Sequence, residues 1–141
     1  MKPINEEIIE EIKKANFVYI IGNGGSASTA NHFANDLVKM AGIKAISLCA
    51  NEAVVMAYAN DSGYENIFSE QLQVFAKPGD LLITISGSGK SPNILKAQEY
   101  ALRWGIPIYQ FPTMEKLECD MQRAEDRHLA LAHEIAESIR S

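Results

Sequence analysis

Two pairs of histidine and acidic residues have a spacing that could bring them together on helices. His32 and Asp36 are four residues apart in a helix-compatible segment, so their side chains would lie on one helical face, one turn from each other. Near the other end of the chain, Glu125 and His133 would point about 80° apart on a helix, within reach of one centre. Such groups can hold a metal ion or exchange a proton. A surface ion pair without chemistry is the common alternative.

The third histidine cannot act with His133 at the same centre. His128 lies five residues before His133, so on a helix the two side chains would point about 140° apart. A single histidine on a helix is usually structural. Asp126 lies seven residues before His133 and would be nearly eclipsed with it, so either Glu125 or Asp126 could form a second acid and histidine face with His133.

Two loops rich in glycine and serine follow apolar runs. GNGGSAS, residues 22–28, follows the run 17–21, and SGSGKSPN, residues 86–93, follows LLITI, residues 81–85. Glycines leave the backbone N–H groups accessible, and hydroxyls at the start of a helix suit a bound phosphate. We expect Ser26 or Ser28 to cap the first of the two helices. A plain strand-to-helix turn would explain one such loop, but two of them favour a phosphate site.

The elements that carry these residues alternate between strand and helix. The sequence predicts a helix over 4–15, with Ile4, Ile8 and Ile12 as its apolar stripe. Residues 114–140 are predicted to form one long helix or two. The other predicted helices are 28–41, 52–59, 64–76 and one running through 94–102, and the predicted strands are 17–21, 44–50, 81–85 and 106–111. This alternation indicates a parallel sheet with helices on both faces, with binding sites beyond the carboxyl ends of the strands.

Composition narrows the class of protein. The 141 residues are expected to form a single domain, 1–141, with a net charge of −5 and scattered basic residues, which argues against a nucleic-acid partner. No stretch approaches the ~20 apolar residues of a membrane span, so we expect no membrane partner. The start of the chain lacks the features of a secretory signal. With Cys49 and Cys119 expected as reduced thiols, the interpretation is a cytoplasmic protein.

Three segments together resemble a known family. IIGNGGSASTANHFANDLV, YANDSGYENIFSEQL and LLITISGSGKSPNILKA are similar to the SIS (sugar isomerase) domain, specifically to phosphoheptose isomerases. The resemblance implies an α/β fold, a three-layer α/β/α sandwich with a parallel four- to five-stranded, flavodoxin-like sheet. It also implies isomerisation of sedoheptulose 7-phosphate to D-glycero-D-manno-heptose 7-phosphate, one zinc ion per subunit, and a homo-oligomer, either a tetramer or a dimer.

The same resemblance assigns roles to individual residues. Ser86, Ser88 and Ser91 are expected to hold the phosphate, while Asp36 and His133 are the candidates for catalytic base and acid. The residues expected to line the sugar are Asn23, Gly24, Ser26 and Asp61, and those expected to hold the metal are His32, Asp36, Glu125 and His133.

The chain departs from the family's pattern at several points. Asp36 stands where the family has Glu, Glu125 where it has Gln, and Gly87 where it usually has Thr, and the segment after Phe111 that supplies a fifth strand is largely absent. The leading interpretation is a sugar-phosphate isomerase. The alternatives are a non-catalytic SIS module that binds a phosphosugar or a protein partner, as in the replication-initiator-associating type, and a shortened form whose assembly builds an incomplete site.

Overall fold

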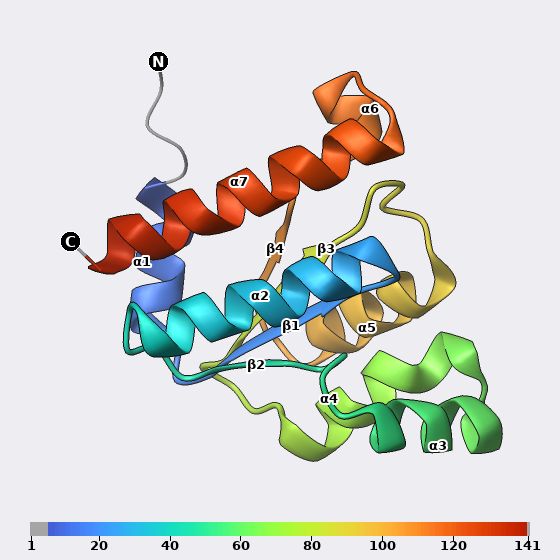
Figure 1. The fold of residues 1–141 in the computed structure, drawn as a ribbon. Coiled ribbons are helices and arrows are strands. Elements are labelled where there is room, and N and C mark those ends of the chain that lie inside the picture. Colours follow the sequence, from blue (N-terminus) through green and yellow to red (C-terminus); the bar gives the residue numbers. More distant parts are fainter. Residues whose placement is uncertain (1–5, 141) are drawn as a thin grey trace.

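Four parallel strands in the order β2-β1-β3-β4 form the centre of the computed structural model, which describes residues 6–140 (Figure 1). The expected fold class is confirmed, with four strands in the described sheet. The strands are β1 (Val18–Gly22), β2 (Ala45–Ser47), β3 (Leu81–Ile85) and β4 (Ile108–Gln110). The helices are α1 (Glu6–Lys14), α2 (Gly25–Lys39), α3 (Glu52–Ser62), η1 (Tyr64–Asn66), α4 (Ile67–Phe75), α5 (Pro92–Arg103), α6 (Met114–Leu117) and α7 (Met121–Arg140).

The two central strands are buried along their whole length. β1 and β3 pair in parallel from Val18 opposite Leu81 to Gly22 opposite Ile85, and every residue in both is buried. Apolar side chains on both faces of these strands contact helices, which is why the sequence shows continuous apolar runs instead of alternation. The edge strands β2 and β4 are shorter and more exposed.

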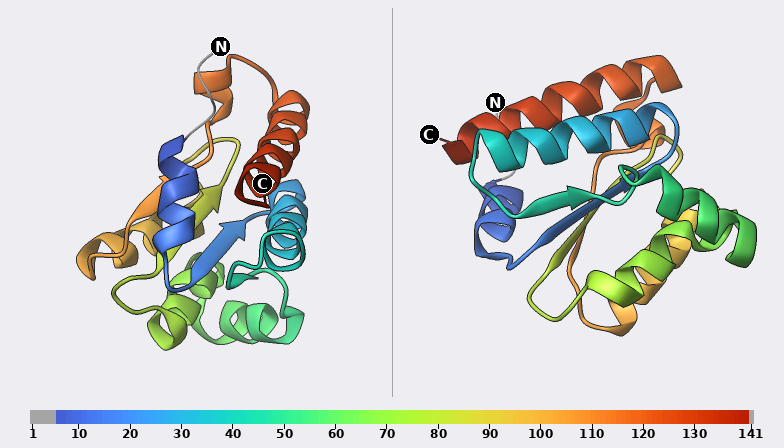
Figure 2. Two further views of the ribbon diagram at one scale, coloured as in Figure 1. Left: turned by 90° about the vertical axis from the view of Figure 1, so that its left-hand side faces the viewer. Right: turned by 60° about the horizontal axis from the view of Figure 1, so that its bottom comes forward.

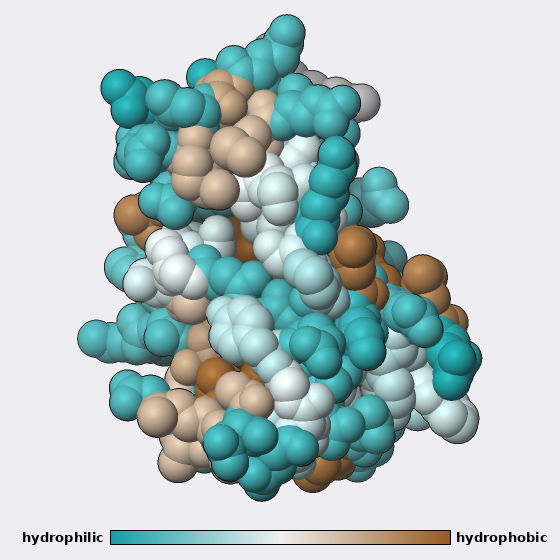
Figure 3. Space-filling model, turned by 90° about the vertical axis from the view of Figure 1, so that its right-hand side faces the viewer, coloured by the Kyte–Doolittle hydropathy of each residue, from teal (hydrophilic) through white to brown (hydrophobic). Residues whose placement is uncertain are grey.

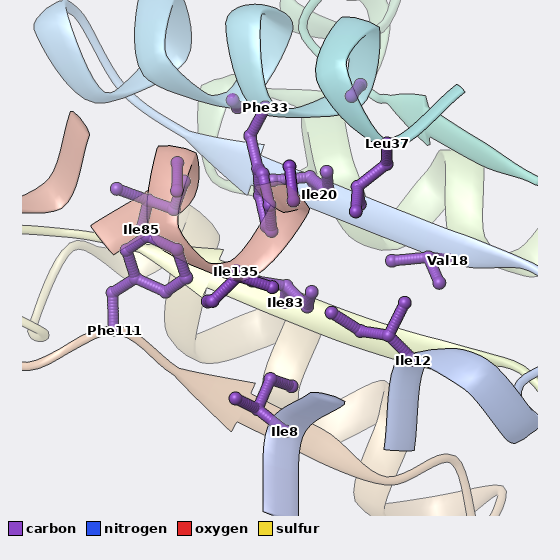
Figure 4. Packing of buried hydrophobic residues seen from close by; sticks show 14 of the residues in the cluster. Ile8, Ile12, Val18, Ile20, Phe33, Leu37, Ile83, Ile85, Phe111 and Ile135 are labelled. Atoms are coloured by element: carbon purple, nitrogen blue, oxygen red, sulfur yellow. The ribbon is translucent and has the colours of Figure 1, made fainter. Parts of the chain in front are cut away.

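Helices cover the two faces of the sheet in separate layers. α1, α2 and α7 lie on one face, and α3, α4 and α5 lie on the other (Figure 2). On the first face Ile20 of β1 and Ile83 of β3 belong to one apolar cluster with Phe33 of α2, with Ile135 of α7 and with Phe111, which follows β4 (Figure 4). A second cluster fills the opposite face with residues such as Tyr19, Ile21, Leu72, Leu82 and Ile94.

Several predicted boundaries move. The helix predicted at 28–41 begins three residues earlier, at Gly25, and the expected capping by Ser26 or Ser28 is wrong, because the N-cap is Gly24 and no side chain caps it. Gly24 adopts a positive φ of 54°, which ends the loop abruptly and lets the helix start at once. The segment 114–140 forms two helices, since Glu118 takes the left-handed conformation after α6. Ile4 lies outside the described residues.

Gly22 sets how closely the start of α2 approaches the sheet. A Cβ atom at this position would lie 2.7 Å from the backbone oxygen of Ser26 and 2.9 Å from that of Ile85. Both neighbours are backbone atoms of buried elements, so neither can move aside without shifting the loop or the strand. The absence of a side chain at Gly22 therefore brings the loop after β1 against the end of β3.

Replacing Gly22 by Ala tests this close approach. We expect Gly22→Ala to lower the free energy of unfolding by about 1–3 kcal/mol, because the added methyl group overpacks the junction. Ser28→Ala is the matched control, since Ser28 is exposed within α2 and caps nothing, and its effect should be close to zero. Denaturant titrations of both variants provide the measurement. Equal stabilities for the two variants would contradict the close approach.

Candidate active site

Helices α2 and α7 lie side by side and run in the same direction (Figures 1 and 2). Small buried residues, among them Ala30 and Ala34 of α2 and Ala132 and Ala136 of α7, belong to the cluster that joins these helices to the sheet. Small side chains let helix backbones come close together. As a result, side chains of α2 can contact side chains of α7 that are about one hundred residues away in the sequence.

Three of the predicted metal ligands meet in this seam. The Nε2 atom of His133 lies 3.0 Å from Nε2 of His32, and Oδ2 of Asp36 lies 3.3 Å from His32 Nε2 and 3.9 Å from His133 Nε2. The two imidazoles are about half exposed, whereas only 11% of the Asp36 side chain is exposed. The carboxylate is thus held at the base of a group that opens to solvent through its two histidines.

The arrangement fits a divalent cation. Atoms bonded at ~2.0–2.2 Å to one tetrahedral zinc ion lie about 3.3–3.6 Å from each other. The three ligand atoms of His32, Asp36 and His133 all lie within 4.8 Å of one another. Two imidazoles and one carboxylate with an open side are the ligand set of many catalytic zinc sites. These residues can therefore hold a metal ion, and in its absence they can share a proton.

Glu125 occupies a different place from these three residues. Its carboxylate packs against Gly25, where a Cβ atom would overlap it, at the first residue of α2. Glu125 is not a member of the group formed by His32, Asp36 and His133. A carboxylate at this place is favoured by the positive end of the α2 dipole.

His128 has a structural contact. It is 1% exposed, its Nε2 lies 2.6 Å from the backbone oxygen of Pro112, and its ring packs against Phe111. Its Nδ1 atom is buried without a hydrogen-bond partner among the described residues. The expectation that His128 and His133 do not share one centre is confirmed, because His128 contacts the segment after β4 while His133 faces His32.

The loop after β3 leaves its hydroxyl groups free to donate. The Oγ atoms of Ser86 and Ser88 accept hydrogen bonds of 3.0 Å from the backbone N–H groups of Gly89 and Lys90. Ser91 occupies the N-cap position of α5 without using its hydroxyl to cap the helix. A hydroxyl that accepts one bond still has its O–H to give. Three such donors near the start of a helix suit a phosphate group.

An amide pair joins this loop to the loop after β1. Asn23 and Asn93 exchange hydrogen bonds of 2.9 Å and 2.8 Å, and Oδ1 of Asn23 also accepts one of 2.9 Å from the Tyr64 hydroxyl. Asn93 is only 1% exposed. The contributions of Asn93 and Tyr64 were not predicted, because an asparagine in the first turn of a helix and a tyrosine after a glycine carry no distinctive sequence signal.

The remaining predicted residues lie around the two loops. Gly24 is exposed at the N-cap of α2, and Ser26 is buried in its first turn. Asp61 is exposed in the last turn of α3, where its Oδ1 accepts a hydrogen bond from Asn60. The Cys49 thiol donates a hydrogen bond to the backbone oxygen of Gly22. Burial raises the pKa of this thiol. The Asp61 contact is local, so its role toward a substrate stays a prediction.

The face on which the strands end is mainly hydrophilic. Hydrophilic and intermediate residues cover its middle, and hydrophobic residues gather in separate patches (Figure 3). Among the described helices, none combines the length and the apolar character needed to span a membrane. The two free cysteines, Cys49 and Cys119, form no disulfide.

Comparisons of the sequence with known proteins agree on one family. The family profile described as the SIS domain matches residues 2–111. The chain is 36% identical to a phosphoheptose isomerase of Trichlorobacter lovleyi over 152 positions, covering 95% of this chain and 78% of the relative. It is 33% identical to that of Thermodesulfovibrio yellowstonii over 157 positions, covering 99% and 78%. Both alignments are longer than this chain, so both relatives contain residues without a counterpart here.

Solved structures of the same name share the fold. The phosphoheptose isomerase of Neisseria gonorrhoeae superposes with a TM-score of 0.81 at 25% identity, over 94% of this chain and 80% of that chain. For the enzyme of Francisella tularensis the TM-score is 0.82 at 22% identity, over 94% and 82% of the two chains, which supports the fold alone.

Removing the amide at Asn93 tests the link between the two loops. We expect Asn93→Ala to lower the free energy of unfolding by about 1–3 kcal/mol, because it leaves the part-buried Asn23 amide without two of its hydrogen bonds. Tyr64→Phe deletes an exposed donor to the same Asn23 oxygen and should cost much less. Thermal unfolding of the two variants compares them directly. A larger loss for Tyr64→Phe would contradict the role of the amide pair.

Proposed function

Because the chain belongs to the SIS domain family and groups with its phosphoheptose isomerases, we propose that it interconverts the ketose and aldose forms of a heptose 7-phosphate. The specific reaction is sedoheptulose 7-phosphate to D-glycero-D-manno-heptose 7-phosphate. The observation that carries the proposal is the meeting of His32, Asp36 and His133 between α2 and α7. Fold similarity alone would not distinguish an enzyme from a binding module.

The phosphate of the substrate has an anchor in the loop after β3. Ser86, Ser88 and Ser91 offer hydroxyl donors, and the N-terminus of α5 adds a favourable dipole. The amide pair of Asn23 and Asn93 fixes this loop relative to the loop that begins α2. In this proposal Asn23, Gly24, Ser26 and Asp61 line the sugar, so that the phosphate end and the reacting end are bound by separate but connected segments.

The chemistry needs a proton to move between two neighbouring carbons. A base removes a proton from the carbon next to the carbonyl group while the carbonyl oxygen takes up a proton, which gives an enediol. The former carbonyl carbon then takes up a proton as the hydroxyl group on the neighbouring carbon loses one, so protons balance and no oxidant or reductant is needed. Oδ2 of Asp36 is our candidate base, and Nε2 of His133 our candidate acid, 3.9 Å away. With acid and base this close, both can serve neighbouring atoms of one bound substrate.

A zinc ion is the proposed cofactor, one per subunit, held by His32, Asp36 and His133. When bound, it stabilises negative charge on the substrate oxygens. Binding a cation and donating a proton are exclusive uses of Nε2 of His133, because a single ring nitrogen serves only one of them at a time. Glu125 was predicted as a fourth ligand, and its carboxylate at Gly25 supports a role at the sugar loop instead.

Metal binding provides a test that does not depend on activity. We expect purified protein to bind divalent zinc or cobalt, and His133→Ala to lose it, because one of three convergent ligands disappears. Glu134→Ala, one residue along and exposed, is the matched control and should bind like the wild type. Calorimetry and cobalt absorption spectra give the readout. Metal binding by His133→Ala at the wild-type level would contradict a metal site shared by these three residues.

Activity then separates the two uses of the three residues. If the cation acts in catalysis, chelation should abolish isomerisation of sedoheptulose 7-phosphate by the wild type, and added zinc should restore it. If Asp36 and His133 act only as base and acid, activity should survive chelation and fall with His133→Ala. A protein that binds the phosphosugar yet shows no turnover under either condition would favour the non-catalytic binding module.

Phosphate binding is tested at the serine loop. The double change Ser86→Ala and Ser88→Ala removes two donors to an anion, each worth about 1.5–3 kcal/mol, and should weaken sugar-phosphate binding at least tenfold. Ser69→Ala changes a buried serine on α4 whose hydroxyl donates to the backbone oxygen of Asn66, the N-cap residue of that helix, so affinity should stay unchanged. Unaltered affinity of the double variant in calorimetry would exclude this loop as the anchor.

We also propose a cytoplasmic protein that forms a homo-oligomer, and the family resemblance supports the assembly. We propose that the first and last long helices, α1 and α7, lie at a subunit interface. Both lie on the same face of the sheet, with their outer sides exposed in the single chain (Figure 2). Light scattering at micromolar concentration measures the assembly, and a monomer would count against it.

A further inference from the structure

The outer edge of the sheet at β4 is open. Within the described part of the chain β4 pairs with β3 alone, and it has no partner on its other side. Pro107 accepts a hydrogen bond from Leu82, and Phe111 donates one to Thr84, so these residues face β3. Because residues alternate in direction along a strand, the backbone groups of Ile108 and Gln110 face outward. An edge of this kind can pair with another strand.

A large hollow lies beside this edge. It encloses about 700 Å³ between β4, α6 and α7, a size typical of a binding site. Its accessible apolar lining comes from the half-buried Leu117 and Tyr109 and the exposed Ala130, above the buried Phe111 and Leu131. The SIS profile also stops matching at residue 111, next to this edge. A partner that reaches β4 can therefore also bury apolar surface on α6 and α7.

Charges of opposite sign lie at the two ends of the hollow. Lys116 of α6 and Arg127 of α7 are close to the end of β4, since α6 follows this strand almost directly. Glu134 lies about 10 Å further along α7. Glu7 of α1 acts on Tyr109, where burial and this carboxylate both raise the pKa of the phenol. The hollow thus has a basic end and an acidic end.

We propose that a second copy of this chain binds here, with the two β4 strands pairing antiparallel about a twofold axis. Antiparallel pairing places the basic end of each hollow against the acidic end of the other, as a self-complementary contact requires. The outward groups of Ile108 and Gln110 then pair with those of Gln110 and Ile108 in the partner subunit. The axis passes beside Tyr109, which faces the same residue of the other copy. The two sheets become one continuous sheet.

The strand pair alone would be too small for a stable dimer. β4 contributes three residues, and specific interfaces bury at least about 1,000 Å² in total. The walls of the hollow on α6 and α7 supply the remaining contact area, and the opposite charges of Lys116 and Glu134 favour the antiparallel orientation of the two subunits. This interface differs from the one proposed above for α1 and α7, because it depends on backbone groups at the edge of β4.

The first test removes a backbone donor at the edge. Gln110→Pro deletes an N–H group that faces outward, so the bonds between β4 and β3 remain, and we expect the dissociation constant of the dimer to rise about tenfold or more. Gln110→Ala keeps this N–H and should dimerise like the wild type. Analytical ultracentrifugation gives the constants, and circular dichroism verifies that both variants fold. A monomeric wild type, or a dimer equally stable in both variants, would overturn the proposal.

The second test exchanges charges across the axis. Lys116→Glu and Glu134→Lys should each weaken the dimer, because each places like charges in contact, and the double variant should recover most of the affinity. Additive weakening in the double variant would contradict the pairing of these ends.

The third test places a cysteine beside the axis. Tyr109→Cys should form a disulfide between two subunits under mild oxidation, because facing residues of an antiparallel pair are close enough for this bond. Trp104→Cys, 58% exposed at the C-cap of α5 and outside the paired strand, should not exceed the background from Cys49 and Cys119. Equal cross-linking of the two variants would exclude the axis.

Discussion

The structure depends on the parallel packing of α2 against α7. β1 leads directly into α2. Because Gly22 has no side chain, the beginning of this helix can lie close against the sheet. α7 returns over the same face and packs along α2 through small residues. Only this seam brings His32 and Asp36 to His133, so the chemistry proposed here has the same origin as the packing of one layer of the fold. A change that separates the helices would remove the site without touching its residues.

Most of the fold could be predicted from the sequence because two strands carry unambiguous patterns. VYIIG and LLITI are too short for helices and too apolar for a sheet edge, and each is followed by a glycine-rich loop and a helix. The start of α2 was predicted late because serine is the common N-cap, whereas here the positive φ of Gly24 allows the turn without a side chain. The preference of serine for the N-cap position was therefore overridden by the close packing of the loop at Gly22.

The candidate site was predicted in part. The four-residue spacing of His32 and Asp36 on one helix is local, and the contact of these residues follows from helix geometry alone. Glu125 was joined to His133 by direction around the helix, but eight residues also advance about 12 Å along its axis. The structure places its carboxylate at the other end of α2, at Gly25. The pairing of Asn23 with Asn93 could not be foreseen, since it depends on how two loops meet at the edge of the sheet.

The long separation of His32 and His133 in the sequence has a consequence for synthesis of the protein. The two residues are 101 positions apart, so α2 leaves the ribosome long before its partner helix exists. Until then the face of α2 that carries Phe33 and Leu37 lacks part of its cover. Closing a segment of this length is entropically costly, which slows the final step of folding. The three-residue group is therefore completed only when the last helix docks, and a chain released early would expose apolar surface to aggregation.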